Sequence, residues 1–148
     1  YTCMDNITVS NYIAPNITIT GWAERKDALK YSASGDVFVL TSLWEGLPIS
    51  LLEAMYMKKV CIVSNIIGNR DVIHTGVNGF VCNNTEEYVK AIQSAKTENV
   101  NHLVEAAYQE IVDTYNTKNM ANEYSKIYLS KMGGGGTKQC NSCTSSRR

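Results

Sequence analysis

An apolar run, Val37–Leu40, is followed by a short loop with a glycine and then by a segment that begins at Pro48. Four apolar residues in a row, followed by Thr41 and Ser42, predict a buried strand. Pro48 suits the first position of a helix, because that position needs no N–H for a helical hydrogen bond. The order of strand, loop and helix N-terminus predicts an α/β fold with a site for an anionic ligand at this edge of the sheet.

Two glutamates flank this turn, with seven residues between Glu45 and Glu53. Glu45 precedes the predicted helix, so its carboxylate is expected near the carboxyl ends of the strands. Glu53 lies about 7.5 Å beyond Pro48 along the helix axis. Because its neighbours are largely apolar, burial of its carboxylate requires hydrogen-bond donors, such as the hydroxyls of a ribose. The alternative is a glutamate on the solvent-facing side of the helix.

Gly46 and Leu47 complete the loop between Glu45 and Pro48. Because Gly46 has no side chain, the backbone can approach a ligand closely there. The helix that begins at Pro48 offers unpaired N–H groups and the positive end of its dipole, which suit a diphosphate. The alternative is that Gly46 only makes a tight turn.

The rest of the chain alternates predicted strands and helices. Ile17 and Ile19 alternate with threonines, which predicts a strand over residues 16–22. Further strands are predicted over residues 37–41, 60–64 and 80–82, and helices over residues 24–33 (with Ala28, Leu29 and Ser32 facing inward), 48–57, 85–96 (with Thr85 as the N-cap), 101–115 and 118–131. Residues 66–75 are predicted to be irregular or to hold one helical turn. This alternation predicts a Rossmann-like parallel sheet with helices on both faces, followed by C-terminal helices.

Length and composition suit one globular domain. The 148 residues are 44% hydrophobic, which is enough for a core. We predict that residues 1–132 form this domain and that the Gly/Ser-rich residues 133–148 are a flexible tail left from cloning. With 14 basic and 14 acidic residues the net charge is zero, which gives nucleic-acid binding little support.

The five cysteines indicate free thiols rather than a metal site. Cys61 and Cys82 lie in apolar runs, where cysteine behaves as a small hydrophobic residue. Cys140 and Cys143 form a C-x-x-C pair without a second pair of ligands at zinc-site spacing, so we expect no metal site. Free thiols indicate a reducing, cytoplasmic compartment. No apolar run reaches the ~20 residues of a membrane span.

Four blocks of residues, in this order, resemble the donor-binding C-terminal domain of a GT-B glycosyltransferase of the retaining group called family 4. They are residues 20–22, residues 31–40, the segment from Glu45 to Glu53, and residues 76–80. The resemblance spans residues 16–131 and rests on the order and spacing of all four blocks. It implies a partial GT-B domain, because the family's earlier strand, its glycine-rich phosphate loop and its N-terminal acceptor domain have no counterpart here.

The resemblance implies transfer of a sugar from a nucleotide-diphosphate sugar to a glycan, lipid-linked or small-molecule acceptor, as in polysaccharide biosynthesis. The anomeric configuration would be retained, and no metal or other cofactor would be required. The acceptor would bind the N-terminal domain, so the chain alone is expected to be inactive as a transferase. The resemblance also implies a cytoplasmic protein that can work at the inner face of a membrane.

The resemblance assigns a role to each candidate site residue. Glu45 would be the catalytic residue, which holds the donor sugar and stabilises positive charge at its anomeric carbon. Glu53 would bind the ribose. The residues that would contact the other parts of the donor are Gly46, Leu47 and Pro48 at the diphosphate and Gly21 and Trp22 at the base. Trp22 either stacks on the base or packs in the core.

The loop at residues 66–75 departs from the family pattern. The family often has two glycines and then a glutamate here, whereas this chain has Ile67, Gly68 and then Asp71. This difference weakens a catalytic role for the loop. Two other functions stay open: a nucleotide-sugar epimerase of the same architecture, or a non-catalytic nucleotide-binding or interaction module in which Glu45 and Glu53 only decorate a helix.

Overall fold

The computed structural model describes residues 14–132, which fall into two units that meet at Asp36 and Val37. The described part of the first unit holds one helix, α2 (Arg25–Ser34). No residue of α2 is buried, and of the three predicted inward residues Leu29 and Ser32 are half-buried while Ala28 is exposed. The prediction of an inner face is therefore only partly right, because the described part of this unit offers no second helix or strand to pack against.

The strand predicted over residues 16–22 is wrong. Residues 17–20 have no regular secondary structure, and the side chains of Ile17 and Ile19 are about half exposed. The alternating pattern is correct for a strand, but a strand also needs neighbouring backbone groups to bond with. The described part of the first unit supplies no such neighbour.

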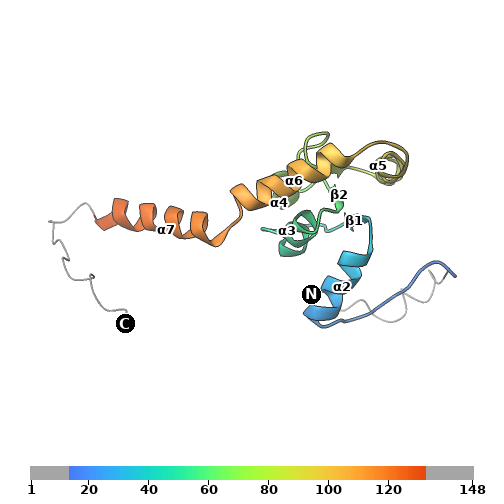
Figure 1. Cartoon of the computed structure of the whole chain (residues 1–148), viewed down its shortest axis with the longest axis horizontal. Coiled ribbons are helices and arrows are strands. Elements are labelled where there is room, and N and C mark those ends of the chain that lie inside the picture. Colours follow the sequence, from blue (N-terminus) through green and yellow to red (C-terminus); the bar gives the residue numbers. More distant parts are fainter. Residues whose placement is uncertain (1–13, 133–148) are drawn as a thin grey trace. The chain divides into compact units, whose positions relative to one another are not determined.

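The second unit is an α/β structure built on a parallel sheet of three strands, which confirms the predicted fold class (Figure 1). The strands are β1 (Val37–Leu40), β2 (Val60–Ser64) and β3 (Phe80–Cys82), in the order β1-β2-β3. The register pairs Val37 with Val60 and Ile62 with Phe80. Because all strands are parallel, their carboxyl ends lie along one edge.

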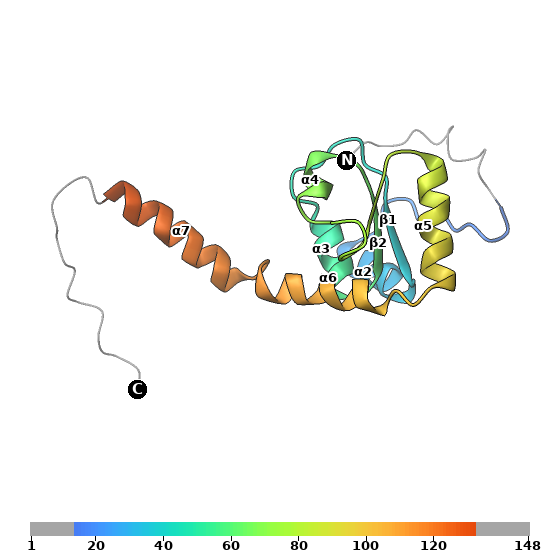
Figure 2. The ribbon, with the colours of Figure 1, turned by 90° about the horizontal axis from the view of Figure 1, so that it is seen from above.

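Helices cover both faces of this sheet (Figure 2). Along β2, side chains alternate between the two faces. Cys61 and Val63 pack with residues of α3 (Ile49–Tyr56) and α6 (Asn101–Asp113). Ile62 packs on the other face, with Ala91 of α5 (Thr85–Thr97).

The central strand is buried and the edge strand is not. β2 is buried from Val60 through Val63, as predicted for an interior strand. β1 is only half-buried, and Val39 is 42% exposed. The prediction of a buried strand at residues 37–41 is thus too strong, since β1 has a strand neighbour on one side only among the described residues.

The predicted starts at residues 24, 48 and 118 are each off by one residue, and so is the predicted N-cap of α5. Pro48 is the N-cap of α3 rather than its first residue, with an extended ψ of 101°, and its carbonyl accepts from Leu51 and Leu52. Asn84, not Thr85, caps α5, because the Asn84 side chain accepts from the N–H of Glu87 at 3.0 Å. An Asn cap leaves Thr85 as the first helical residue.

The later helices differ in burial. α6 buries one row of its predicted apolar stripe, namely Leu103, Ala107 and Ile111. α7 (Thr117–Met132) has no buried side chain among its described residues, and Tyr124 and Ile127 are more than half exposed. Within residues 14–132, no helix combines the length and apolar character needed to cross a membrane.

Candidate functional site

The loop after β1 holds Glu45 at the carboxyl edge of the sheet. The Ser42 hydroxyl donates to Glu45 Oε1 at 2.7 Å, and both side chains are half-buried. This bond fixes one oxygen of the carboxylate. Ser42 is held in turn by a hydrogen-bond network formed by Ser64, Asn69 and Tyr88.

This network includes Ser64, the last residue of β2. The Ser64 hydroxyl donates to the Ser42 carbonyl at 2.6 Å. Asn69 Nδ2 donates to the hydroxyl and to the carbonyl of Ser64, both at 3.0 Å. Asn69 is fully buried, and its Oδ1 has no hydrogen-bond partner among the described residues. A buried acceptor without a partner costs about 1–3 kcal/mol, which the two bonds donated by Asn69 Nδ2 must offset.

Tyr88 joins this network from the opposite face of the sheet. Its hydroxyl donates to the Leu40 carbonyl at 3.4 Å and also bonds with the Ser64 side chain. Burial raises the pKa of Tyr88, so its hydroxyl remains a donor at neutral pH. The ends of β1 and β2 are thereby tied together from both helical layers.

Gly68 supports the backbone of the same loop. A Cβ at Gly68 would lie 2.1 Å from the Gly46 carbonyl oxygen and 2.5 Å from the Glu45 carbonyl oxygen. Gly68 is buried in the short helix α4 (Ile67–Arg70). The one glycine that this chain keeps from the family's pair is therefore needed for close packing of backbone on backbone.

Gly46 itself faces open space. A Cβ there would meet no heavy atom within 4 Å, and its φ is not positive. Neither crowding nor a left-handed turn requires glycine at this position, which argues against the tight-turn alternative. Next to Gly46, Leu47 is half exposed and Pro48 is buried. The first N–H groups of α3 lie here, and no side chain caps this helix.

Glu53 and the base-pocket residues occupy different surroundings. Glu53 lies in the second turn of α3 and is half-buried. Gly21 and Trp22 belong to the first unit, whereas Glu45 belongs to the second. Gly21 has a φ of +61°, which only glycine adopts freely, and Trp22 is 83% exposed. This exposure contradicts the alternative that Trp22 packs in a core within its unit.

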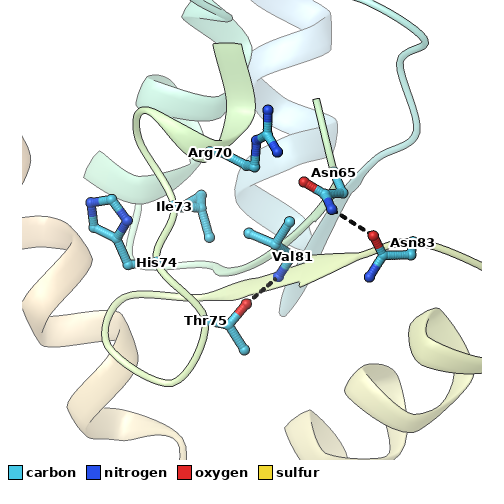
Figure 3. A pocket seen from close by; sticks show the side chains of 7 residues that line it. All are labelled: Asn65, Arg70, Ile73, His74, Thr75, Val81 and Asn83. Carbon is cyan, nitrogen blue, oxygen red and sulfur yellow. Dashed lines mark hydrogen bonds between the residues drawn. The ribbon is translucent and has the colours of Figure 1, made fainter. Parts of the chain in front are cut away.

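A second concave region follows β2 and β3. It is an open depression of about 450 Å³ lined by Asn65, Arg70, Ile73, His74, Thr75, Val81 and Asn83. Figure 3 shows the amides of Asn65 and Asn83 pointing toward each other, and Asn65 Nδ2 donates to Asn83 Oδ1. This depression was not predicted from the sequence. The available signal was that Asn65 and Asn83 each follow the last residue of a parallel strand.

Metal-ligating side chains are dispersed in the described part of the chain. No group of three or more His, Cys, Asp or Glu side chains there is arranged to hold a metal ion.

A match to a family model shows which protein family the chain belongs to. The model described as "Glycosyl transferases group 1" matches residues 7–120. The chain belongs to this family. The match covers all seven predicted site residues, from Gly21 to Glu53. It also covers the hydrogen-bonded residues Ser42, Ser64 and Asn69.

Two relatives agree with this membership. The chain is 31% identical over 116 residues to the UDP-Gal:alpha-D-GlcNAc-diphosphoundecaprenol alpha-1,3-galactosyltransferase of Escherichia coli, covering 76% of this chain and 30% of that protein. It is 29% identical over 123 residues to an uncharacterized glycosyltransferase of Methanocaldococcus jannaschii, covering 80% of this chain and 31% of that protein. The chain thus spans about three-tenths of the length of the curated relatives it matches.

Proposed function

We propose that this glycosyltransferase chain binds the donor of the reaction, a nucleotide-diphosphate sugar. The observation that carries the proposal is the placement of Glu45 at the carboxyl edge of the sheet. Its carboxylate is fixed by Ser42 beside the open backbone at Gly46 and the uncapped start of α3. A carboxylate that accepts from hydroxyls and a helix N-terminus that attracts a diphosphate are the two groups such a donor needs.

Each site residue has a defined role in this proposal. Glu45 accepts hydrogen bonds from the hydroxyls of the donor sugar and stabilises the positive charge that develops at its anomeric carbon. The backbone of Gly46, Leu47 and Pro48 faces the diphosphate. Glu53 binds the ribose. No metal is required, because the helix N-terminus takes part of the role that a cation has at a leaving diphosphate.

The base would be bound by the loop with Gly21 and Trp22. Trp22 is exposed and offers an aromatic face on which a nucleobase can stack. UDP-sugars are the first donors to test, because the name of the E. coli relative specifies UDP-Gal.

The transfer would retain the anomeric configuration, with a glycan, lipid-linked or small-molecule acceptor. The diphosphoundecaprenol in the name of the E. coli relative supports a lipid-linked acceptor and a reaction at the cytoplasmic face of a membrane. The acceptor would bind residues that correspond to the remaining length of the relatives. We therefore expect the isolated chain to bind donor without measurable turnover.

Calorimetric titration tests the donor site. The chain is titrated with UDP, GDP, ADP and their sugars, and the titrations are repeated with Glu45→Gln and Glu53→Ala. Glu123→Ala is the matched control, because Glu123 is an exposed glutamate that pairs with Lys126 in α7. We expect selective binding of one nucleotide class that both site variants weaken and the control leaves unchanged.

Two results would contradict the proposal. One is the absence of binding by the unmodified chain with every nucleotide. The other is binding that Glu45→Gln and Glu53→Ala leave intact, which would favour an interaction module with decorative glutamates.

A further inference from the structure

We infer that Asn69 is a positioning residue for Glu45 and that it acts through Ser64 and Ser42. The functional consequence of this inference rests on the proposed role of Glu45 in donor binding. Its structural content does not, because the same contacts determine how the loop at residues 42–46 is held.

The contacts form an unbroken path. Asn69 Nδ2 donates to Ser64 Oγ at 3.0 Å, and Ser64 Oγ donates to the Ser42 carbonyl at 2.6 Å. Ser42 Oγ then donates to Glu45 Oε1 at 2.7 Å. The path runs through the Ser42 residue itself, because its carbonyl accepts from Ser64 while its hydroxyl donates to Glu45.

The chemistry of Ser64 fixes the orientation of the Asn69 amide. The Ser64 carbonyl can only accept, and it lies 3.0 Å from the Asn69 amide. The atom that faces it must therefore be Nδ2, which leaves Oδ1 as the buried atom without a partner. The use of Asn69 lies in its two donated bonds, and an aspartate of the same shape could not make them.

The other buried asparagine of the chain's described part shows the contrast. Asn78 Oδ1 accepts from the His74 N–H at 2.7 Å, and its Nδ2 donates to the Val72 carbonyl and to Glu110. Asn78 thus satisfies both ends of its amide within the core. Asn69 leaves one end unsatisfied and directs the other end toward the loop that carries Glu45.

The residue next to Asn69 holds the same loop at a second point. Gly68 packs directly under the carbonyl groups of Glu45 and Gly46. Neighbouring residues of α4 therefore fix the loop at two points: Asn69 holds Ser64, which donates to the Ser42 carbonyl, and Gly68 contacts the backbone at Gly46. With two points of support, the Glu45 side chain is held before any ligand arrives.

Backbone order parameters measured by NMR test the structural part without any ligand. In the unmodified chain, residues 43–47 should be ordered, with order parameters of about 0.85, and Asn69→Asp and Ser64→Ala should lower these values to about 0.6. Asn78→Ala is the matched control, and it should leave this loop unchanged. Ser64→Ala keeps the serine backbone, so it remains informative if Asn69→Asp does not fold. A loop that stays ordered in both variants would overturn the inference.

A double-mutant cycle tests the functional part with the nucleotide sugar that binds in the titration above. Asn69→Ala should weaken binding about tenfold in the unmodified chain and have no effect once Glu45→Ala, which removes the oxygen that accepts from Ser42, is present. Asn78→Ala should change binding equally with and without Glu45→Ala. An equal loss from Asn69→Ala in both backgrounds would overturn positioning through Glu45. If no nucleotide sugar binds, the proposed function fails, while the NMR experiment still decides the role of Asn69.

Discussion

At the scale of single residues, the two glycines Gly46 and Gly68 have opposite surroundings. Gly68 lies under the carbonyl oxygens of the Glu45 loop, whereas Gly46 faces open space. A sequence pattern marks both as glycine and cannot separate these cases, because the difference depends on which segment packs against each one. The structure makes them a matched pair for mutagenesis.

We expect Gly68→Ala to lower the free energy of unfolding by about 1–3 kcal/mol, because the added methyl group forces backbone apart. Gly46→Ala should leave stability unchanged or raise it by about 0.4–1 kcal/mol, since its φ suits alanine and the unfolded chain loses entropy. Urea unfolding of both variants measures the difference. Equal stability of the two variants would contradict the packing seen at Gly68.

The buried cysteines should be chemically inert in the folded chain. Burial raises the pKa of Cys61 to about 12 and also raises the pKa of Cys82, so both remain protonated thiols at neutral pH. We expect iodoacetamide at pH 8 to leave both unlabelled, as measured by mass spectrometry of their peptides. The urea-unfolded chain is the control, and equally fast labelling of the folded chain would argue against this burial.

At the scale of elements, local sequence patterns predicted which helices and strands exist better than they predicted where each one begins and ends. β2, β3 and α6 match their predicted ranges closely, because apolar periodicity decides them. The caps at Pro48 and Asn84 were each missed by one residue, since the choice depends on backbone ψ and on one side-chain bond. The strand over residues 16–22 failed for a different reason: strand formation depends on a partner that local sequence does not encode.

The N-terminus of α5 should give stability that depends on pH. Hydrogen bonds from the backbone and the side chain of Asn83 lower the pKa of Glu87 below its usual 4.5. A lowered folded-state pKa means that this stabilisation is present above pH 4.5 and is lost as the pH falls through the lowered value.

Glu87→Gln should therefore lower the melting temperature at pH 7, and the gap to the unmodified chain should narrow as the pH falls below 4.5. Thermal unfolding followed by circular dichroism across this range measures the gap. A gap for Glu87→Gln that is constant with pH would contradict the assignment.

α6 and α7 should contribute differently to stability. Ile111 of α6 is buried in the main core, so Ile111→Ala should cost about 2–5 kcal/mol. Ile127 of α7 is 56% exposed, so Ile127→Ala should change stability by less than about 0.5 kcal/mol. Chemical unfolding measures both. A large loss from Ile127→Ala would mean that the α7 surface is covered in the folded chain.

At the scale of the whole molecule, the layered α/β architecture follows from the sequence, but the hydrogen bonds within the site do not. The order of strands and helices was enough to predict a parallel sheet with Glu45 at its carboxyl edge. The path from Asn69 to Glu45 joins segments 24 residues apart in the chain, and serine and asparagine give no periodic signal. The depression at Arg70 and His74 was missed for the same reason, since its walls come from separate loops.

The backbone contact between Gly68 and the Glu45 loop distinguishes loop residues that support the fold from loop side chains that can be replaced. Because the support comes from main-chain atoms and from Ser42, the exposed side chains of Leu43, Trp44 and Leu47 take no part in it. A combinatorial library at these three positions would therefore change the chemistry presented around the carboxylate while the scaffold beneath it stays intact. In the proposed donor site, such a library samples sugar preference without altering the contacts that support the loop.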